Sequence, residues 1–351
     1  MLSVERLALP NGETGLLEVY APAGPAEYAQ NADHLDALWE MVVQPRQPWF
    51  SRSEWELFTR ALRGQLTPAS ADRFYAIWIA GRPAAHVFLN YAADHGQVAQ
   101  VGFVVTEPAF RGRGLCSLLM TRVIADFRER GGQCALLGTG NPVAHAIYAR
   151  AGFSDYIGHT MRYLADASQP AHFDREYFAY RRPARPRAGH WGDGARLAWL
   201  YASRCGSFVK HYSEGIYEHP AITHVRCCSI LPALMLNVEE RRGGLWVLET
   251  PDGRLVGTAS LTLSDTTAQH KAPLLDFTLT PAYWGQAADL LHKAIDAAWA
   301  GGANVVRACL ASCDHDKAEV LQSLAFRLEA TLAGQFVAGD ERYDLNVYVL
   351  E

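Results

Sequence analysis

Residues 111–116, near the middle of the chain, have the composition of a loop that could bind phosphate. Their sequence is Arg-Gly-Arg-Gly-Leu-Cys, and they follow an apolar stretch at 101–105 that favours a buried strand. An apolar pattern with helical spacing begins directly after them. A helix N-terminus offers unpaired N–H groups and the positive end of a dipole, and glycines let an anion approach the backbone. Because Arg111 and Arg113 add positive charge, the pattern predicts a pyrophosphate site.

A second group of residues, about thirty positions further on, narrows the choice of ligand. Residues 134–137 favour a short buried strand, and Asn141 then opens a helical segment that carries Tyr148 and ends at Gly152. The loop at 111–116 is not a Walker loop, because no Gly-Lys-Ser/Thr closes it, and it lacks the third glycine of a dinucleotide fingerprint. The structural alternatives are a glycine turn at a strand–helix junction and an ordinary packed tyrosine.

Together the two groups resemble the signature motifs of the GNAT superfamily of acyl-CoA-dependent N-acyltransferases. The first is Arg-Gly-Arg-Gly-Leu, and the second is Asn-x-x-Ala-x-x-Ile-Tyr-x-x-x-Gly-Phe. The resemblance implies that the glycine-rich loop wraps the CoA pyrophosphate and that the preceding strand splays from its neighbour to admit the pantetheine arm. One departure is Cys116, which stands where the family usually has Gly or Ala and is small enough to fit.

Carried over by position, the resemblance assigns roles to particular residues. Tyr148 would protonate or steady the departing thiolate, and Asn141 would contact the pantetheine. The expected cofactor-binding residues are Phe103, Val104, Val105, Arg111, Gly112, Arg113, Gly114, Leu115, Cys116, Asn141 and Tyr148. A backbone N–H near Val104 or Val105 would face the acyl carbonyl oxygen.

The general base is harder to assign, because residues 97–105 contain no carboxylate. His86, Asn90 and His95 lie on or beside the neighbouring predicted strand, and a water molecule held by one of them could accept the amine proton. His86 is our candidate catalytic residue beside Tyr148. A purely structural role is the alternative for each histidine.

Length and composition indicate a globular protein of more than one domain. The chain has 351 residues, 49% hydrophobic and 20% charged, so two domains are expected. A net charge of −5 gives no general attraction to nucleic acid or to anionic membranes. No apolar run approaches the roughly 20 residues of a membrane span, and residues 1–6 lack a signal peptide's apolar core. We expect a cytoplasmic protein, monomeric or homodimeric, without nucleic-acid or membrane partners.

The seven cysteines are scattered, as expected for reduced thiols rather than a disulfide framework. Cys309 and Cys313 lie near His315, but no second ligand pair accompanies them. We therefore expect no metal.

The order of elements before the loop is that of a GNAT domain. A strand at 15–20 precedes helical segments from residue 27, including one with a capping box at Ser53 and Glu56, and strands follow at 73–80, 84–92 and 97–105. The resemblance implies that these helical segments lie over an acceptor pocket, with candidate walls at Trp49, Phe50, Trp55 and Phe58, and the alternative is that these aromatic residues only pack the helices. After Phe153 only one strand is visible, at 159–164. We therefore expect domain 1 to take a strand from the linker or from the second half.

The second half resembles a worn copy of the first. A shift of 173 residues places Gly112 on Gly285 and Phe153 on Phe326, which indicates an internal repeat. The copy has lost the loop and the tyrosine, since the same shift replaces Arg111 by Trp284, Gly114 by Ala287, Asn141 by Asp314, Tyr148 by Leu321 and Gly152 by Ala325. Between the halves, residues 166–193 are rich in proline and arginine and predict a linker.

We therefore expect an α/β (α+β) protein with two GNAT-like domains in tandem, each a mixed, mostly antiparallel twisted sheet flanked by helices. Residues 1–165 would form the acyl-CoA-binding catalytic domain, 166–193 a linker and 194–351 a degenerate domain that binds no CoA. The expected function is transfer of an acetyl or other acyl group from CoA to an amine of a small molecule or peptide. The alternatives are a non-catalytic acyl-CoA sensor and an aminoacyl-tRNA-dependent transferase.

Overall fold

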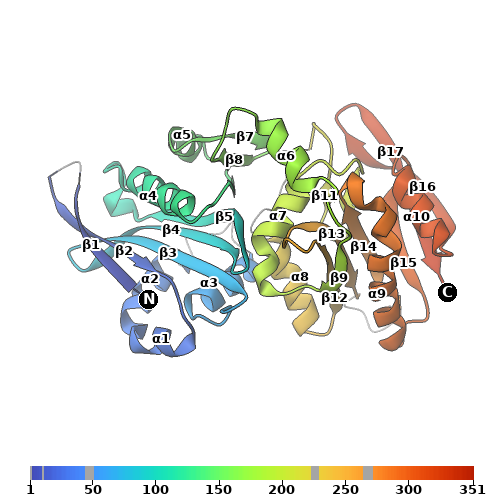
Figure 1. Cartoon of the computed structure of the whole chain (residues 1–351), viewed down its shortest axis with the longest axis horizontal. Helices are drawn as coiled ribbons and strands as arrows, with labels where there is room; N and C mark the ends of the chain where they lie inside the picture. Colours follow the sequence, from blue (N-terminus) through green and yellow to red (C-terminus); the bar gives the residue numbers. More distant parts are fainter. Residues whose placement is uncertain (1, 10–11, 44–50, 223–228, 264–271) are drawn as a thin grey trace. The chain divides into compact units, whose positions relative to one another are not determined.

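A computed structural model describes residues 2–9, 12–43, 51–222, 229–263 and 272–351. The chain forms two compact units (Figure 1). Unit 1 comprises Met1–Pro170, Trp191–Ala198 and Cys227–Pro232, and unit 2 comprises Ala171–His190, Trp199–Arg226 and Ala233–Glu351. Each unit is built on one mixed, mostly antiparallel sheet flanked by helices, which confirms the predicted fold class.

Unit 1 contains an eight-stranded sheet with the strand order β1-β2-β3-β4-β5-β6-β8-β7. All neighbouring strands are antiparallel except β5 and β6, which are parallel. Its elements are β1 (Leu2–Ala8), β2 (Thr14–Tyr20), α1 (Pro25–Gln30), α2 (Ala32–Val43), α3 (Arg52–Leu62), β3 (Ser70–Ile79), β4 (Arg82–Ala92), β5 (His95–Thr106), η1 (Pro108–Phe110), α4 (Leu115–Glu129), β6 (Cys134–Gly138), α5 (Pro142–Arg150), β7 (Phe153–Ile157) and β8 (Thr160–Leu164).

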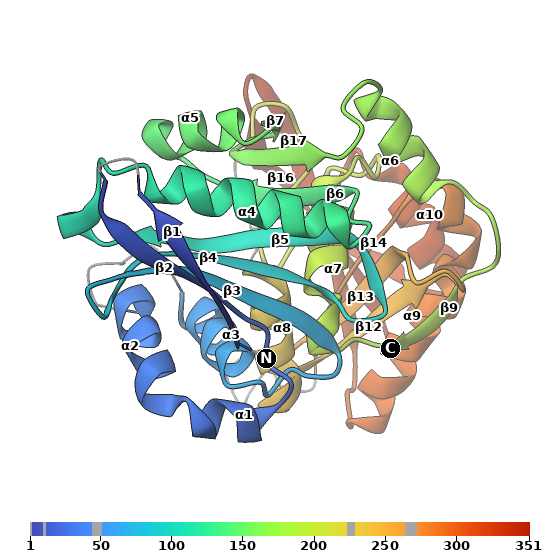
Figure 2. The ribbon, with the colours of Figure 1, turned by 60° about the vertical axis from the view of Figure 1, so that its left-hand side comes forward.

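The sheet of unit 1 is buried on both faces, because its strands carry apolar side chains on alternate sides. Helix α4 packs its apolar side, including Leu119, Val123 and Phe127, on one face with Tyr148 of α5. Helices α2 and α3 pack Leu38 and Phe58 on the other (Figure 2). The loop between β5 and α4 therefore lies at the end of a strand whose sheet is covered by helices on both faces.

Two predictions for unit 1 are wrong in detail. The sheet does not lack its last strand, because β7 pairs with β8 along Phe153–Ile157. This strand escaped notice because it is short and contains the exposed residues Ser154 and Asp155, as an edge strand can. The capping box of α3 is formed by Ser51 and Glu54, two positions before the predicted pair.

Unit 1 also uses a short segment from beyond residue 165. Within Trp191–Ala198, the side chain of Arg196 is fully buried and pairs with Asp193 at 2.8 Å and with Asp94 at 3.6 Å. The guanidinium carbon of Arg60 lies 5.1 Å from the centroid of the Trp191 ring. The compact unit is thus larger than the segment 1–165 that the sequence indicated.

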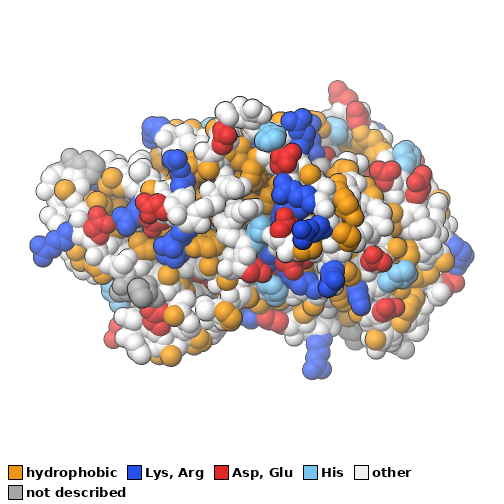
Figure 3. Space-filling model, viewed as in Figure 1, with side chains coloured by type: hydrophobic (Ala, Val, Ile, Leu, Met, Phe, Trp, Pro, Cys, Tyr) orange, Lys and Arg blue, Asp and Glu red, His pale blue; other side chains and the backbone are white. Residues whose placement is uncertain are grey.

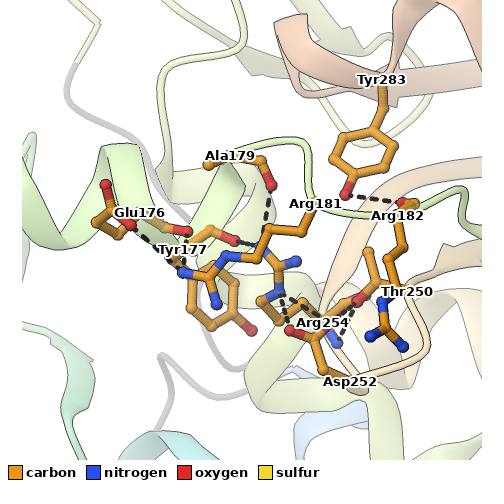
Figure 4. A network of polar contacts seen from close by, with 9 residues as sticks. All are labelled: Glu176, Tyr177, Ala179, Arg181, Arg182, Thr250, Asp252, Arg254 and Tyr283. Atoms are coloured by element: carbon orange, nitrogen blue, oxygen red, sulfur yellow. Dashed lines mark hydrogen bonds and ion pairs between the residues drawn. The ribbon is translucent and has the colours of Figure 1, made fainter.

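The predicted linker has regular structure, contrary to the expectation from its composition. Helix α6 (Pro170–Phe178) and strand β9 (Arg185–Ala188) lie in it, and β9 pairs with β12 of unit 2. Arg254, which is 3% exposed, donates hydrogen bonds to the carbonyls of Tyr177 and Ala179 and pairs with Asp252 (Figure 4). Tyr177 and Phe178 pack on Trp199. Buried aromatic rings and a buried arginine outweigh the effect of the prolines.

Unit 2 contains a seven-stranded sheet with the order β16-β17-β15-β14-β13-β12-β9 and a separate hairpin, β10–β11. Only β14 and β15 are parallel. The short helix η2 (Trp191–Asp193) lies in unit 1, and α7 (Gly194–Ala202) and α8 (Ile230–Glu239) begin there and continue in unit 2. The remaining elements of unit 2 are β10 (Val209–His211), β11 (Ile216–Tyr217), β12 (Gly243–Glu249), β13 (Leu255–Thr262), β14 (Leu274–Leu279), η4 (Pro281–Gln286), α9 (Ala287–Ala300), β15 (Val306–Ala311), α10 (His315–Ser323), β16 (Arg327–Ala338) and β17 (Glu341–Leu350).

The strand order of unit 2 follows that of unit 1 from β2 onward. In both sheets an antiparallel run ends at one parallel pair, β5–β6 or β14–β15, and a helix connects the two strands of that pair. In both, the last two strands form a hairpin whose second strand lies next to the parallel pair. The elements also keep the spacing of about 173 residues that the sequence suggested.

Candidate active site

The predicted phosphate loop connects β5 to α4 and leaves the start of the helix open. Gly112 and Gly114 have φ angles of 77° and 75°, which non-glycine residues adopt rarely. Gly114 is the N-cap of α4, and no side chain caps the helix. A Cβ atom at Gly112 would meet nothing within 4 Å. An anion could therefore reach the first-turn N–H groups of a 15-residue helix.

Of the two arginines of the loop, Arg111 is exposed and Arg113 is half-buried, and both contact other parts of unit 1. Arg111 donates through Nε to the carbonyl of Thr106 at 3.1 Å. Arg113 forms an ion pair with Glu13 at 2.6 Å, and its guanidinium carbon lies 5.1 Å from the Phe110 ring centroid. An exposed ion pair contributes only about 0–1 kcal/mol, so a phosphate could replace Glu13 at little cost.

Strand β5 separates from β6 before it reaches the loop. The two strands pair only from Val98–Gln100 to Cys134–Leu136, although β5 continues to Thr106. Past Gln100, in the described part of the sheet, the strand register of β5 continues with β4, and its pairing with β6 has ended. The two parallel strands are therefore apart along residues 101–106, where the resemblance places the pantetheine arm.

A bulge interrupts β5 within this opening. His86 pairs with Val105 and Phe88 with Gly102, so β5 has one more residue than β4 between these pairs. Phe103 has a φ of 46°, a left-handed value that is costly for an aromatic residue. The bulge turns the local backbone groups away from the regular ladder. It lies at Phe103, Val104 and Val105, the predicted acyl-binding residues.

The side chain of His86 forms a hydrogen bond to the backbone of this bulge. The side chain is 0% exposed, and its Nδ1 lies 2.9 Å from the carbonyl oxygen of Phe103. A ring nitrogen facing a carbonyl must carry the proton, so Nδ1 is the donor. Burial among Phe58 and Phe74 lowers the pKa of His86 to about 4, and the ring is neutral near pH 7. His86 is therefore placed to position the bulge, and its burial argues against the predicted role as a base.

Tyr148 lies on α5 beside the first turn of α4. It is 6% exposed, and burial, with a smaller contribution from Cys116, raises its pKa above the usual value of 10.0. The hydroxyl consequently stays protonated at neutral pH and could act as a proton donor but not as a base. Burial also raises the pKa of the Cys116 thiol to about 11, so this cysteine is not an activated nucleophile.

Asn141 has a structural role at the start of α5. Its Oδ1 accepts hydrogen bonds from the N–H groups of Val143 at 2.9 Å and Ala144 at 3.3 Å, as an N-cap residue does. Of the predicted pocket walls, Trp55 and Phe58 pack next to Phe103, at centroid distances of 6.2 and 4.9 Å. Trp49 and Phe50 lie outside the described residues.

The other two base candidates are also buried. Asn90 donates to Ser70 Oγ and to Asp72 Oδ1, both at 2.7 Å, and His95 is 6% exposed. Burial raises the pKa of Asp72 to about 6. The sequence did not indicate this carboxylate, because the resemblance suggests an acid on β5, whereas Asp72 lies on β3.

The corresponding opening in unit 2 is filled by the chain itself. The Asp314 carboxylate, at the start of α10, accepts hydrogen bonds from the N–H groups of Phe208 at 2.5 Å and Val209 at 3.0 Å. On β14, Asp276 accepts from the N–H of Tyr212 at 2.6 Å. The hairpin β10–β11 is thereby held against both β14 and α10, the positions where unit 1 is open.

Metal-ligand clusters, membrane-spanning helices and charged patches are further features that could indicate a function. Within the described residues, no cluster of three or more His, Cys, Asp or Glu side chains could hold a metal ion. None of the helices in the described ranges is long and apolar enough to cross a membrane. Acidic and basic side chains are intermixed on the face shown in Figure 3, in keeping with the small net charge of −5.

Comparison with known proteins gives one family match. Residues 35–153 match the model of the acetyltransferase (GNAT) family. No curated protein matches the chain. Solved structures with a similar fold include an N-acetyltransferase from Staphylococcus aureus Mu50, with 18% identity over 48% of this chain and 99% of the other and a TM-score of 0.41.

Two further solved structures have comparable similarity. One is yncA from Salmonella typhimurium with its cofactor acetyl-CoA, with 20% identity, 48% and 94% coverage and a TM-score of 0.39. The other is a ribosomal-protein-alanine N-acetyltransferase from Brucella melitensis, with 17% identity, 47% and 98% coverage and a TM-score of 0.40. The family match includes β5, the glycine-rich loop and Tyr148, so residues 35–153 form a domain of the acetyltransferase (GNAT) family.

Proposed function

We propose that unit 1 transfers an acetyl or other acyl group from CoA to an amine of a small molecule or peptide. The observation that carries the proposal is the combination of an uncapped α4, opened by two left-handed glycines, with a bulged and separated β5. A diphosphate needs the first feature, and a thioester arm that must reach past a sheet edge needs the second.

The residues would act in the following way. The N–H groups of residues 113–116 hold the pyrophosphate, supported by the charges of Arg111 and Arg113. A backbone N–H of Val104 or Val105 at the bulge faces the acyl oxygen and stabilises the negative charge that develops there. Tyr148 supplies a proton to the sulfur as the amine displaces it, a role that its raised pKa supports.

His86 takes part as a positioning residue in this proposal. Its Nδ1–H holds the Phe103 carbonyl and so maintains the left-handed backbone on which the direction of the neighbouring N–H groups depends. A histidine with a pKa of about 4 and no exposed surface is suited to a fixed hydrogen bond rather than to proton transfer from an incoming amine.

We further propose that unit 2 is a second, degenerate copy of the same fold that binds no CoA. The strand order and the spacing of 173 residues support a repeat. Ala325, which corresponds to Gly152, keeps a positive φ of 65° where the glycine has 94°. An alanine in this conformation is a strained substitute for an ancestral glycine.

The proposal is tested with the full chain by calorimetry and turnover. We expect one CoA to bind per chain, and thiol release from acetyl-CoA to depend on an added amine from a panel of primary amines. Binding of CoA without turnover on any amine would favour an acyl-CoA sensor. Absence of CoA binding would contradict the proposal and would leave aminoacyl-tRNA as the donor to examine.

A further inference from the structure

Unit 2 contains a cavity of about 480 Å³ between its two hairpins, β10–β11 and β16–β17. Four aromatic side chains line it, those of Phe208, Tyr212, Tyr217 and Phe336. The polar groups of its lining are the Ser213 hydroxyl, the Gln335 amide and the two tyrosine hydroxyls. The volume lies in the range of small-molecule sites, roughly 300–1,000 Å³, and such sites combine apolar walls with a few polar groups.

The aromatic rings form one connected group around Phe336. The centroid of its ring lies 5.4 Å from that of Phe208, 5.5 Å from Tyr217 and 6.3 Å from Tyr212, at interplanar angles of 66° to 90°. Phe208 and Phe336 are each 7% exposed, while both tyrosines are half-buried. The wall is thus held in place by its own ring contacts before any ligand arrives, which lowers the entropic cost of binding.

The charges around the cavity favour a cation. Its described lining contains no lysine or arginine. Directly behind it, the Asp276 carboxylate accepts hydrogen bonds from the Tyr212 N–H and from the N–H and hydroxyl of Ser213, at 2.6, 3.2 and 2.5 Å. These three donors are neutral. Two other groups also interact with the carboxylate, the His211 ring, whose Nδ1 lies 3.4 Å from Oδ2, and Lys317, whose charge also interacts with Asp314.

The two lysines next to the hairpin each have a carboxylate partner. Lys210 pairs with Glu218 at 3.1 Å. Lys317 donates to the carbonyl of Val209 in β10 at 2.5 Å, and its charge interacts with Asp314 as well as with Asp276. Burial raises the pKa of Tyr212 and of Tyr217, so both hydroxyls remain neutral. The described lining therefore combines several aromatic rings with no lysine or arginine. Behind it, the carboxylates of Asp276, Asp314 and Glu218 outnumber the two lysines, so the local charge stays negative.

We propose that this cavity is a binding site for a small organic cation with an apolar body, such as a protonated or quaternary amine. Aromatic rings attract a cation through their quadrupoles, and the Asp276 charge adds to this attraction. The apolar remainder of the ligand is removed from water by the same rings. The inference does not depend on acyl transfer in unit 1.

The test compares two compounds of the same shape that differ in charge. Choline and 3,3-dimethylbutan-1-ol are titrated into the full-length protein by calorimetry and by saturation-transfer NMR. We expect choline to bind at least tenfold more tightly than the neutral alcohol. Equal affinity for the two compounds, or no binding of choline at tens of millimolar, would overturn the proposal.

Four variants, one of them a control, locate the site. Phe336→Leu removes the central ring and should weaken choline binding at least fivefold, whereas Phe326→Leu, a buried residue of unit 2 outside the cavity, should leave it unchanged. If Phe336→Leu does not fold, Tyr217→Leu replaces a half-buried ring and should give the same loss. Asp276→Asn should reduce the preference for choline over the alcohol. An unchanged preference would show that Asp276 plays no part, contrary to the proposal.

Discussion

The separations of β5 from β6 and of β14 from β15 stand at the same place in two sheets with the same strand order, and they differ in what lies beside them. In unit 1 the parallel strands pair at three positions and then separate, and no further strand of the described residues pairs with β5 there except β4. In unit 2 they pair at the single position Leu274–Arg307, and the hairpin β10–β11 lies against the gap. The same topology can therefore receive a ligand or a segment of its own chain.

The residues that fill the opening in unit 2 stand at the positions that form the site in unit 1. With the shift of 173 residues, Asp276 corresponds to Phe103 at the bulge, and Asp314 corresponds to Asn141 at the start of α5. Both aspartates bind backbone N–H groups of the hairpin. A carboxylate in each position would repel a phosphate or a thiolate, so the change that closes unit 2 also makes it a poor site for CoA.

The loops differ as much as the openings. Gly114 caps α4 with a left-handed conformation and no side chain, while Gln286 and Ala287 occupy the start of α9 after the longer turn η4. We infer that an anion site at this place needs the two glycines, whereas the fold does not, because the cores of both units are formed by other residues.

The largest effect that tests this comparison is expected from Gly114→Asp. The substitution forces a side chain into a backbone with φ of 75° and places a negative charge at the phosphate site, so we expect CoA binding to be abolished in calorimetry. Gly131→Asp is the matched control, because Gly131 has a φ of 80° in open space at the other end of α4. Loss of binding in both variants, or a stoichiometry of two in the wild type, would contradict the comparison.

Tyr148→Phe tests the second feature that unit 2 has lost. The ring remains and one hydroxyl is removed, so CoA affinity should be nearly unchanged while kcat falls by roughly 10², the low end for a general acid. Because burial raises the pKa of Tyr148 above 10.0, the hydroxyl stays protonated as the pH rises. The wild-type kcat should therefore not decline between about pH 7 and 10 through this residue. Tyr163→Phe, in the same core, should keep full activity, and an unchanged kcat for Tyr148→Phe would assign it to packing alone.

Asp314→Ala tests the closed opening of unit 2. The change leaves the N–H groups of Phe208, Val209 and Ala311 without their carboxylate, which should cost about 2 kcal/mol of stability and speed hydrogen exchange at these amides. Asp316→Ala, an exposed residue of the same helix, should change little. CoA stoichiometry should remain one. A second bound CoA in Asp314→Ala would mean that the hairpin alone excludes it, and that the lost glycines are unimportant.

The sequence predicts those parts of the site whose structure is formed by residues close together in the chain. The glycine loop, its helix and the start of α5 at Asn141 are each set within a few residues, and the structure has them where the motifs place them. The hairpin contact in unit 2 joins residues 105 and 106 positions apart, and the His86–Phe103 bond joins residues 17 apart. No local pattern could reveal either.

The errors of sequence interpretation have a common physical origin. Strand β7 is polar because it lies at an edge, and residues 171–190 are rich in proline and arginine although Arg254 and Trp199 bind them into unit 2. In both places burial and hydrogen bonds from distant residues outweigh local composition. The segment Trp191–Ala198 belongs to unit 1 for the same reason, since the charge of Arg196 is paired there with Asp94.

The smallest effect is expected from substitutions of His86. They test whether this residue positions the backbone or acts as a base. His86→Leu removes the hydrogen bond to Phe103, and we expect kcat to fall about tenfold, or roughly 1.4 kcal/mol, with CoA affinity unchanged. His86→Asn keeps a donor near the place of Nδ1 and should restore most of the activity, which a lost base could not do.

The pKa of His86 also predicts how stability depends on pH. Because its pKa of about 4 in the folded chain lies below the usual 6.5, the unfolded chain binds an extra proton between these two pH values. The unfolding free energy of the wild type must therefore fall as the pH drops from 6.5 towards 4. His86→Leu should show a weaker fall in unfolding free energy over that range. Equal losses of kcat in the Leu and Asn variants would instead make His86 a proton acceptor.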